Sequence, residues 1–262
     1  MGHISISLWV TCLVRFYFHI YLIHYFTQEG QMKHYLFTST TAKYIWKSIA
    51  TLGLFTLTQS FMLAYILAPS NQGFFMGLYI FIFIATLFTP LWFDRIHPKT
   101  FITKRNAVKP LPTFLAGYGI ITLLNAILTY ALGEESYTIA QPNQDIIEMV
   151  MGQFIYLILP MTVFIAPIVE ELIFREWLPK LFRNIGRKFK MKDRNATLGG
   201  FIVGSFLFTL MHAPAGLQGW VVYGGLSAVL AYTRYKFTIE ASIMMHFYYN
   251  VFAASVMLMG LA

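Results

Sequence analysis

Charged residues are scarce in this chain of 262 residues, and cysteine is almost absent. Only 11% of the residues are Asp, Glu, Lys or Arg, whereas 57% are hydrophobic and the mean hydropathy is +0.61. A soluble globular protein carries roughly a quarter charged residues, so this composition excludes that class. The single cysteine, Cys12, excludes an internal disulfide and a metal site built from thiolates.

Apolar runs of about 20 residues recur along the chain, and a run of this length crosses a hydrocarbon core of about 30 Å. They predict an all-α, multi-pass helical membrane protein. We expect seven transmembrane segments, at residues 45–67, 74–93, 111–132, 151–174, 196–213, 220–232 and 241–261.

An earlier apolar run, 4–26, is interrupted by Arg15, His19 and His24. Three interpretations of it stay open: an eighth span, an interfacial helix, or sequence upstream of a natural start at Met32. We therefore divide the chain into an uncertain N-terminal segment (1–31), N-terminal transmembrane segments (32–145) and a core that carries the polar motifs (146–262).

Basic residues lie on one side of the expected membrane. Counting Arg175, 18 of the 19 Lys and Arg fall on that side, and the opposite connections 70–73, 134–150 and 213–219 contain none. The positive-inside rule makes the basic side cytoplasmic and the C-terminus external. The net charge of +8 then reflects topology and anionic headgroups rather than nucleic acid. We expect a bacterial plasma-membrane protein, with an amphipathic basic helix at 176–194 lying at the interface.

Two adjacent glutamates and an arginine interrupt the fourth apolar run, in the stretch PIVEELIFREW (167–177). Ionisable groups are costly at membrane depth and usually face a protein interior or a wet cavity. Glu171 and Arg175 are spaced i,i+4, which favours an ion pair on one helix face. Glu170 points about 100° away and stays available as a general base. The alternative is that both glutamates belong to a structural salt-bridge cluster.

Two further polar positions occur in later spans. Phe208 and His212 are spaced i,i+4 in FTLMH, and His246 and Asn250 have the same spacing in HFYYN. A lone buried histidine is usually a hydrogen-bonded core residue. Two histidines, an asparagine and a carboxylate in three separate spans instead predict one shared wet site.

The three motifs, taken in this order, resemble the CPBP intramembrane proteases, which include CAAX proteases and bacteriocin-processing enzymes and are also called the Abi family. EELIFR fits Glu-Glu-x-x-x-Arg, FTLMH fits Phe-x-x-x-His, and HFYYN fits His-x-x-x-Asn. The resemblance covers roughly residues 145–255. It implies a helical membrane protease.

The resemblance also implies a role for each motif residue. Glu170 would activate a water that His212 helps to hold or polarise. His246 and Asn250 would stabilise the oxyanion of the tetrahedral intermediate, a contribution of roughly 3–4 kcal/mol per donor in hydrolases. The supporting residues would be Glu171 and Arg175, which brace the site, and Phe208, which packs beside it.

A zinc ion is an alternative at the same residues. Glu170, His212 and His246 could supply a His₂Glu ligand set with one open position. The chain has no HExxH motif, and a glutamate that binds metal cannot also be a free base. We therefore favour a mechanism without a metal and keep zinc as the alternative cofactor.

The depth of His212 poses a geometric problem. At 1.5 Å per residue, a straight helix from Ala196 carries His212 about 24 Å inward. This segment must then be tilted or begin outside the bilayer, or the catalytic cavity must be deep. We expect Glu170, His212 and His246 to converge within water-bridging distance. The spacing of Gly200 and Gly204 predicts close helix packing in the same segment.

The sequence thus predicts an intramembrane endopeptidase that hydrolyses a membrane-associated peptide or protein, in peptide maturation or self-immunity. One alternative is a non-catalytic membrane immunity or scaffold protein that keeps the fold. Another is a transporter with the carboxylates as a proton relay, which would favour related halves that this chain lacks. The expected partners are membrane lipids and the substrate, without nucleic acid, and the sequence leaves the oligomeric state open.

Overall fold

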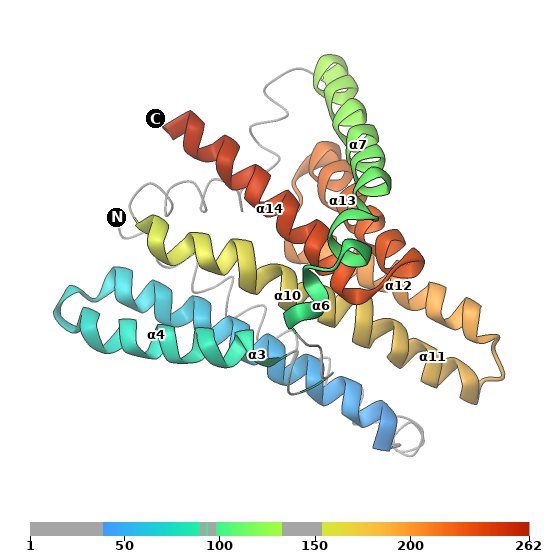
Figure 1. Cartoon of the computed structure of the whole chain (residues 1–262), viewed down its shortest axis with the longest axis horizontal. Coiled ribbons are helices and arrows are strands. Elements are labelled where there is room, and N and C mark those ends of the chain that lie inside the picture. The colour runs from blue at the N-terminus through green and yellow to red at the C-terminus, as the bar shows by residue number, and fades with distance from the viewer. Residues whose placement is uncertain (1–38, 90–92, 94–97, 133–153, 262) are drawn as a thin grey trace.

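A computed structural model of the chain describes residues 39–89, 93, 98–132 and 154–261. All regular elements in these ranges are helices, which confirms the predicted all-α class (Figure 1). The interpretations of 4–26, the segment 1–31 and Cys12 lie outside the described residues. The main helices are α3 (Ser39–Leu67), α4 (Gln72–Leu87), α6 (Pro98–Phe101), α7 (Leu111–Leu132), α10 (Ala166–Glu171), α11 (Leu178–Lys188), α12 (Asp193–Met211), α13 (Gly216–Lys236) and α14 (Ile239–Leu261).

The seven expected segments are helical where the structure describes them, except at Phe88, His212 and Ala213, but the count of seven spans is not confirmed. Four helical stretches are long and apolar enough to cross a membrane: Thr40–Leu67, Lys104–Leu132, Phe154–Lys188 and Ile239–Gly260. α4 is apolar but only 16 residues long. α12 and α13 do not qualify, because polar and small residues lower their hydropathy. The described chain is therefore a helical membrane protein in which four spans are supported.

The helix Phe154–Lys188 forms the centre of the fold. Of its apolar window, 61% is buried inside the protein, against 11–22% for the other three candidate spans. It contains α10 and α11 and two π-helical turns, Met161–Ile165 and Leu172–Trp177. In Figure 1 it runs across the middle of the molecule, with the α3–α4 pair on one side and α12, α13 and α14 on the other. A span enclosed in this way can hold ionisable side chains away from lipid.

The amphipathic helix expected at 176–194 is shorter in the structure, where it forms the last turns of this central helix and ends at Lys188. α11 ends in a Schellman motif, in which Lys190 adopts a φ of 56° and donates its N–H to Arg187 O. The N–H of Met191 donates to Gly186 O, which completes the motif. The chain then reverses into α12, so that α11 and α12 form an antiparallel hairpin (Figure 1).

Glycines bring the two arms of this hairpin into close contact. A Cβ on Gly186 would lie 2.5 Å from the Cβ of Ala196, and one on Gly200 would lie 2.5 Å from Pro179 Cα. Further along, a Cβ on Gly204 would lie 2.4 Å from the carbonyl oxygen of Phe174. These separations are too short for any side chain, so the glycines permit the close approach that the GxxxG spacing predicts.

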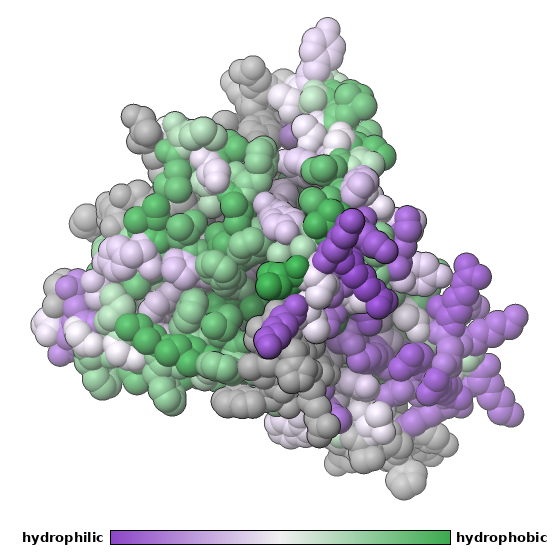
Figure 2. Space-filling model, viewed as in Figure 1, coloured by the Kyte–Doolittle hydropathy of each residue, from purple (hydrophilic) through white to green (hydrophobic). Residues whose placement is uncertain are grey.

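Hydrophilic and hydrophobic residues occupy different parts of the surface. Figure 2 shows hydrophilic residues gathered over the end of α11 and the start of α12, at the right of the view, and hydrophobic residues over much of the left. α7 packs against α13, where a Cβ on Gly117 or Gly225 would meet the side chain of Val229 or Ile121 respectively. The polar end of the hairpin is therefore separate from the apolar body that would face lipid.

Candidate active site

The hairpin of α11 and α12 brings Glu170 and His212 close together, with Glu170 Oε2 4.0 Å from His212 Nε2. Contacts between the arms step along both helices in opposite directions, from Gly186 with Ala196 to Phe174 with Gly204. One turn beyond Phe174 is Glu170, and two turns beyond Gly204 is His212. α12 begins at the exposed Asp193, 19 residues before His212. The depth of His212 in the membrane stays a prediction.

Three side chains converge at this level. Glu170 Oε2 lies 4.0 Å from His212 Nε2 and 3.8 Å from His246 Nε2. The carboxylate is buried, and among the described residues Oε2 has no hydrogen-bond partner. The separations are too long for direct hydrogen bonds but fit a small bridging species. Glu170, His212 and His246 therefore surround one small space.

The other ring nitrogen of each histidine has a fixed partner. His212 Nδ1 lies 2.8 Å from Phe208 O, and a carbonyl can only accept, so this nitrogen carries the proton. His246 Nδ1 lies 3.0 Å from Glu171 Oε1, which also accepts when the carboxylate is ionised. In the neutral rings both Nε2 atoms are then acceptors, and both face Glu170. Three acceptors facing one point require a donor between them, such as a water molecule.

Glu171 connects Arg175 of the central helix with His246 of α14. This fully buried carboxylate lies 3.4 Å from Arg175 NH1 and 3.0 Å from His246 Nδ1. Ser242 also donates to its other oxygen, Oε2. Glu171 is therefore occupied on both oxygens, whereas Glu170 is not. The structure separates the two adjacent glutamates in the way that the i,i+4 spacing suggests.

Arg175 is enclosed by a hydroxyl and an aromatic ring. It is 1% exposed, and its NH2 donates to Ser227 Oγ at 2.8 Å. Its Cζ lies 4.2 Å from the ring centroid of Phe208, a cation–π contact. The same Phe208 ring lies 4.3 Å from the ring of His212. Phe208 thus packs between the bracing arginine and a histidine of the site.

Asn250 lies against the central helix and is not brought into contact with Glu170. Its Nδ2 donates to Thr162 O at 2.7 Å. Thr162 is in a π-helical turn where the N–H of Ala166 donates to Met161 O and Pro167 has no N–H to offer. The Thr162 carbonyl therefore lacks its usual backbone donors, and Asn250 supplies one. The second Nδ2 hydrogen of Asn250 is not used by this bond.

Sequence reasoning missed three polar residues around the site. Ser242 and Ser227 contact Glu171 and Arg175, and the ring of Tyr223 lies 4.8 Å from that of His212. Ser242 stands four residues before His246 on one helix, so its i,i+4 spacing was a usable signal. Ser227 and Tyr223 belong to α13, and no local pattern connects them with the other motifs.

The side chains that suit zinc chemically are not placed as zinc ligands. Ligands at about 2.0–2.1 Å from a tetrahedral zinc ion lie roughly 3.4 Å from one another. The Nε2 atoms of His212 and His246 are 4.0 and 3.8 Å from Glu170 Oε2. Among the described residues, no group of three His, Cys, Asp or Glu is arranged to hold a metal ion. This geometry does not fit a tetrahedral zinc site.

Comparison with known proteins finds a family model that matches the part of the chain holding these residues. Residues 152–252 match the model of a family described as type II CAAX prenyl endopeptidase Rce1-like. The match confirms the resemblance to CPBP proteases that the motifs indicate. No curated protein and no solved structure matches the chain.

Proposed function

Since residues 152–252 match the Rce1-like family, we propose that the chain is an intramembrane peptidase that hydrolyses a peptide bond of a membrane-associated peptide or protein. The catalytic residues in this proposal are Glu170, His212, His246 and Asn250. Glu171, Arg175 and Phe208 support them. The family match supports protease activity in general, and the role proposed for each residue is the one that the motif resemblance implies.

One observation carries the proposal most directly. Glu170 Oε2 is buried without a hydrogen-bond partner among the described residues. Two histidine Nε2 atoms lie within 4.0 Å of it, but in the neutral rings both are acceptors and cannot pair with the carboxylate. A purely structural cluster would pair this carboxylate with a donor, because an unsatisfied buried polar group costs roughly 1–3 kcal/mol. A site that binds a reactive water molecule instead leaves this carboxylate oxygen free to accept a hydrogen bond from that water.

Water activation follows from the positions of these acceptors. A water between them donates one hydrogen to Glu170 and the other to a histidine Nε2. Glu170 takes its proton as the water oxygen attacks the carbonyl carbon of the scissile bond, and the carbonyl π electrons move to the oxygen. General-base catalysis of this kind contributes about 10²–10⁴-fold to the rate.

The tetrahedral oxyanion needs hydrogen-bond donors. Asn250 offers its second Nδ2 hydrogen. His246 faces the same space with Nε2 and can donate to the oxyanion when that nitrogen carries a proton, and Glu171 Oε1 holds its Nδ1 from 3.0 Å away. The intermediate then collapses with cleavage of the C–N bond. Glu170 returns its proton to the leaving amine, and the new carboxyl group loses its remaining proton to solvent.

The substrate class follows from the surroundings of the site. Glu170 lies in a helix that can cross a membrane, so the scissile bond must reach membrane depth. A peptide or protein already attached to the membrane meets this condition. We place peptide maturation or self-immunity as the biological role, and the plasma membrane with the basic loops cytoplasmic as the location.

Comparison of membranes from cells that carry the wild type, Glu170→Gln or Glu240→Gln tests the proposal. Glu170→Gln keeps the size of the side chain and removes the base. Glu240→Gln makes the same change in the first turn of α14, outside the site. Mass spectrometry would identify new peptide termini in the membranes after equal amounts of each variant have been verified.

We expect termini that appear with the wild type and with Glu240→Gln but fall by at least about 100-fold with Glu170→Gln. Those termini would also identify the substrate. If they persist in Glu170→Gln, or if no termini depend on the wild type while its biological activity remains, the catalytic proposal fails and the non-catalytic alternative is favoured.

A further inference from the structure

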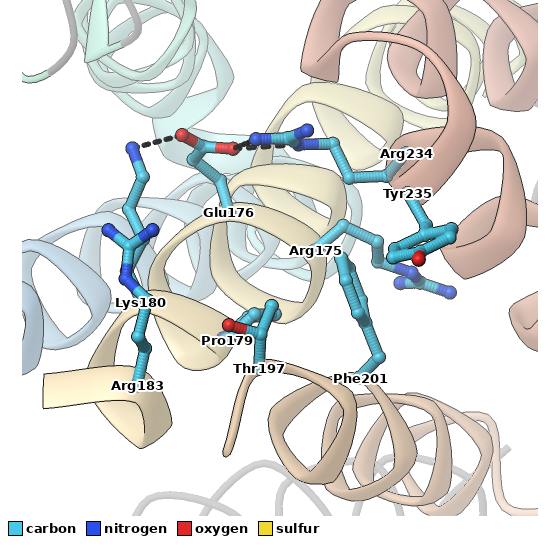
Figure 3. A pocket seen from close by; sticks show the side chains of 9 residues that line it. All are labelled: Arg175, Glu176, Pro179, Lys180, Arg183, Thr197, Phe201, Arg234 and Tyr235. Atoms are coloured by element: carbon cyan, nitrogen blue, oxygen red, sulfur yellow. Dashed lines mark hydrogen bonds and ion pairs between the residues drawn. The ribbon is translucent and has the colours of Figure 1, made fainter. Parts of the chain in front are cut away.

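A pocket lies at the polar end of the molecule, between α11, α12 and the last turn of α13. Its volume is about 210 Å³. The residues that line it are Arg175, Glu176, Pro179, Lys180, Arg183, Thr197, Phe201, Arg234 and Tyr235 (Figure 3). Only Arg175 belongs also to the candidate active site, where its guanidinium contacts Glu171 and Ser227. The pocket is therefore a separate site.

Positive charge dominates this pocket. Four of its lining residues are Lys or Arg and one is acidic. Glu176 is held between Lys180 on one side and Arg234 on the other, with Arg234 Nε at 2.8 Å and NH2 at 2.6 Å from Oε2 (Figure 3). The single carboxylate thus leaves a net charge of +3 in the wall. An anion in the pocket would relieve the mutual repulsion of these cations.

Two arginine N–H groups in this wall are buried and unsatisfied. Within the described residues, the Nε atoms of Arg183 and Arg175 have no hydrogen-bond partner. Each guanidinium offers donors in a rigid fork that matches the oxygens of a phosphate group. In Figure 3 the Arg183 side chain runs from α11 toward Lys180, which places the two cations at the same end of the pocket.

The surroundings indicate that the anion belongs to a lipid. Phe189, Met191 and Ile202 are 71%, 49% and 62% exposed around the turn between α11 and α12 and on α12 itself. Phe189 and Met191 alternate in the sequence with the exposed Lys190 and Lys192. Apolar tips mixed with lysines are typical of a protein surface at headgroup level. Basic pockets between helices on the cytoplasmic side of a membrane bind lipid phosphates.

We propose that this pocket binds the phosphate group of an anionic glycerophospholipid, with Arg183, Lys180 and Arg234 as its ligands and Phe201 and Tyr235 as the apolar wall. The site is distinct from the proposed catalytic one. The experiments that test this site measure lipid binding rather than proteolysis, so their outcome does not depend on the peptidase proposal.

Two variants remove the pocket in different ways. Arg183→Gln removes one cation and its buried Nε, and Thr197→Leu fills the space while every charge remains. Arg194→Gln is the matched control, since Arg194 is exposed at the start of α12 and does not line the pocket. The control loses the same charge and measures general attraction to anionic lipid.

Thermal unfolding of the purified full chain in a neutral detergent is the first measurement, with phosphatidylglycerol, phosphatidylcholine or inorganic phosphate added. Native mass spectrometry is the second, and it counts the phosphatidylglycerol molecules that stay bound. We expect phosphatidylglycerol to raise the melting temperature of the wild type and of Arg194→Gln by several degrees. The shift should be at most half as large in Arg183→Gln and in Thr197→Leu, with one fewer lipid retained.

Equal shifts in all four proteins would overturn the proposal, because the lipid would then bind by surface charge alone. An equal shift with phosphatidylcholine would also overturn it, since no net anionic charge would be needed. If inorganic phosphate reproduces the full shift and displaces the retained lipid from the wild type, the pocket takes a free phosphate ion and the lipid assignment is wrong.

Discussion

His246 Nδ1 lies 3.0 Å from Glu171 Oε1, although the two residues are 75 positions apart. This bond makes Glu171 more than the partner of Arg175, because it also fixes the orientation of a histidine that faces Glu170. Glu171 therefore orients the His246 ring, and Glu170 borders the space where water is expected.

Ser242→Ala tests whether the orientation of Glu171 matters for hydrolysis. The change removes the hydroxyl that donates to Glu171 and leaves the contacts with Arg175 and His246. A hydrogen bond to a charged group is worth about 1.5–3 kcal/mol, so we expect peptide hydrolysis to fall roughly tenfold or more. Product formation by purified protein in detergent would measure it.

Ser255→Ala is the control for this prediction. Ser255 is on the same helix, is exposed, and donates to the carbonyl of Val251, one turn before it. The control should keep full activity. Equal rates for Ser242→Ala and Ser255→Ala would show that the hydroxyl of Ser242 does not support the site.

Gly204→Ala tests the close packing of the hairpin. The new Cβ would lie 2.4 Å from the carbonyl oxygen of Phe174, and because this is a backbone atom the helices must separate. Overpacking of this kind costs roughly 1–3 kcal/mol. The separation would also move His212 away from Glu170, so activity should fall together with the melting temperature.

Gly199→Ala provides the matched comparison for the hairpin. A Cβ at Gly199 meets only Phe182 Cδ1, at an ordinary 3.8 Å. Both variants add the same methyl group to α12, and we expect Gly199→Ala to be neutral or slightly stabilising, as alanine favours a helix. A Gly204→Ala protein as stable and active as Gly199→Ala would contradict the described packing.

Asn250→Ala should reduce stability as well as activity. It removes the donor to Thr162 O, a carbonyl that has lost its usual backbone donors, and an unpaired buried acceptor costs about 1–3 kcal/mol. Asn250→Asp should be at least as destabilising, because an ionised carboxylate cannot donate a hydrogen bond. Thermal unfolding in detergent measures both variants. An unchanged melting temperature in Asn250→Asp would show that the hydrogen bond contributes nothing.

Removal of metal ions distinguishes the two mechanisms weighed for this site. In the glutamate mechanism, activity should persist after treatment with 1,10-phenanthroline and extensive dialysis, whereas Glu170→Gln should abolish it. Loss of activity on chelation, with recovery on addition of Zn²⁺, would require Glu170, His212 and His246 to move into a tetrahedral arrangement. Metal analysis of the purified protein would accompany the assay.

Sequence patterns were sufficient for the helical class and for the residues that meet around Glu170. The motif residues lie within single helices, so spacings of four residues already place Glu171 beside Arg175 and Phe208 beside His212. The helical state of the seven segments follows from their composition.

Other features depend on contacts between distant segments and had no local signal. The donation from Asn250 to Thr162 requires a π-helical turn, and the sequence shows only Pro160 and Pro167 near it. The pairing of Glu176 with Arg234 joins residues 58 positions apart. The number of spans is likewise weakly determined, since α4 is only 16 residues long and α12 and α13 fall short in hydropathy.

The hairpin of α11 and α12 also fixes how the length of this chain can vary. Glu170 and His212 stay level because similar numbers of residues separate each of them from the turn after Lys188. One residue added within either arm would shift the rest of that arm by 1.5 Å and turn it by about 100°, which would aim a catalytic side chain at lipid. The same residue added at 189–192 would leave both arms in register. Among proteins that keep this site, variation in length should therefore collect in the turn and be excluded from the arms.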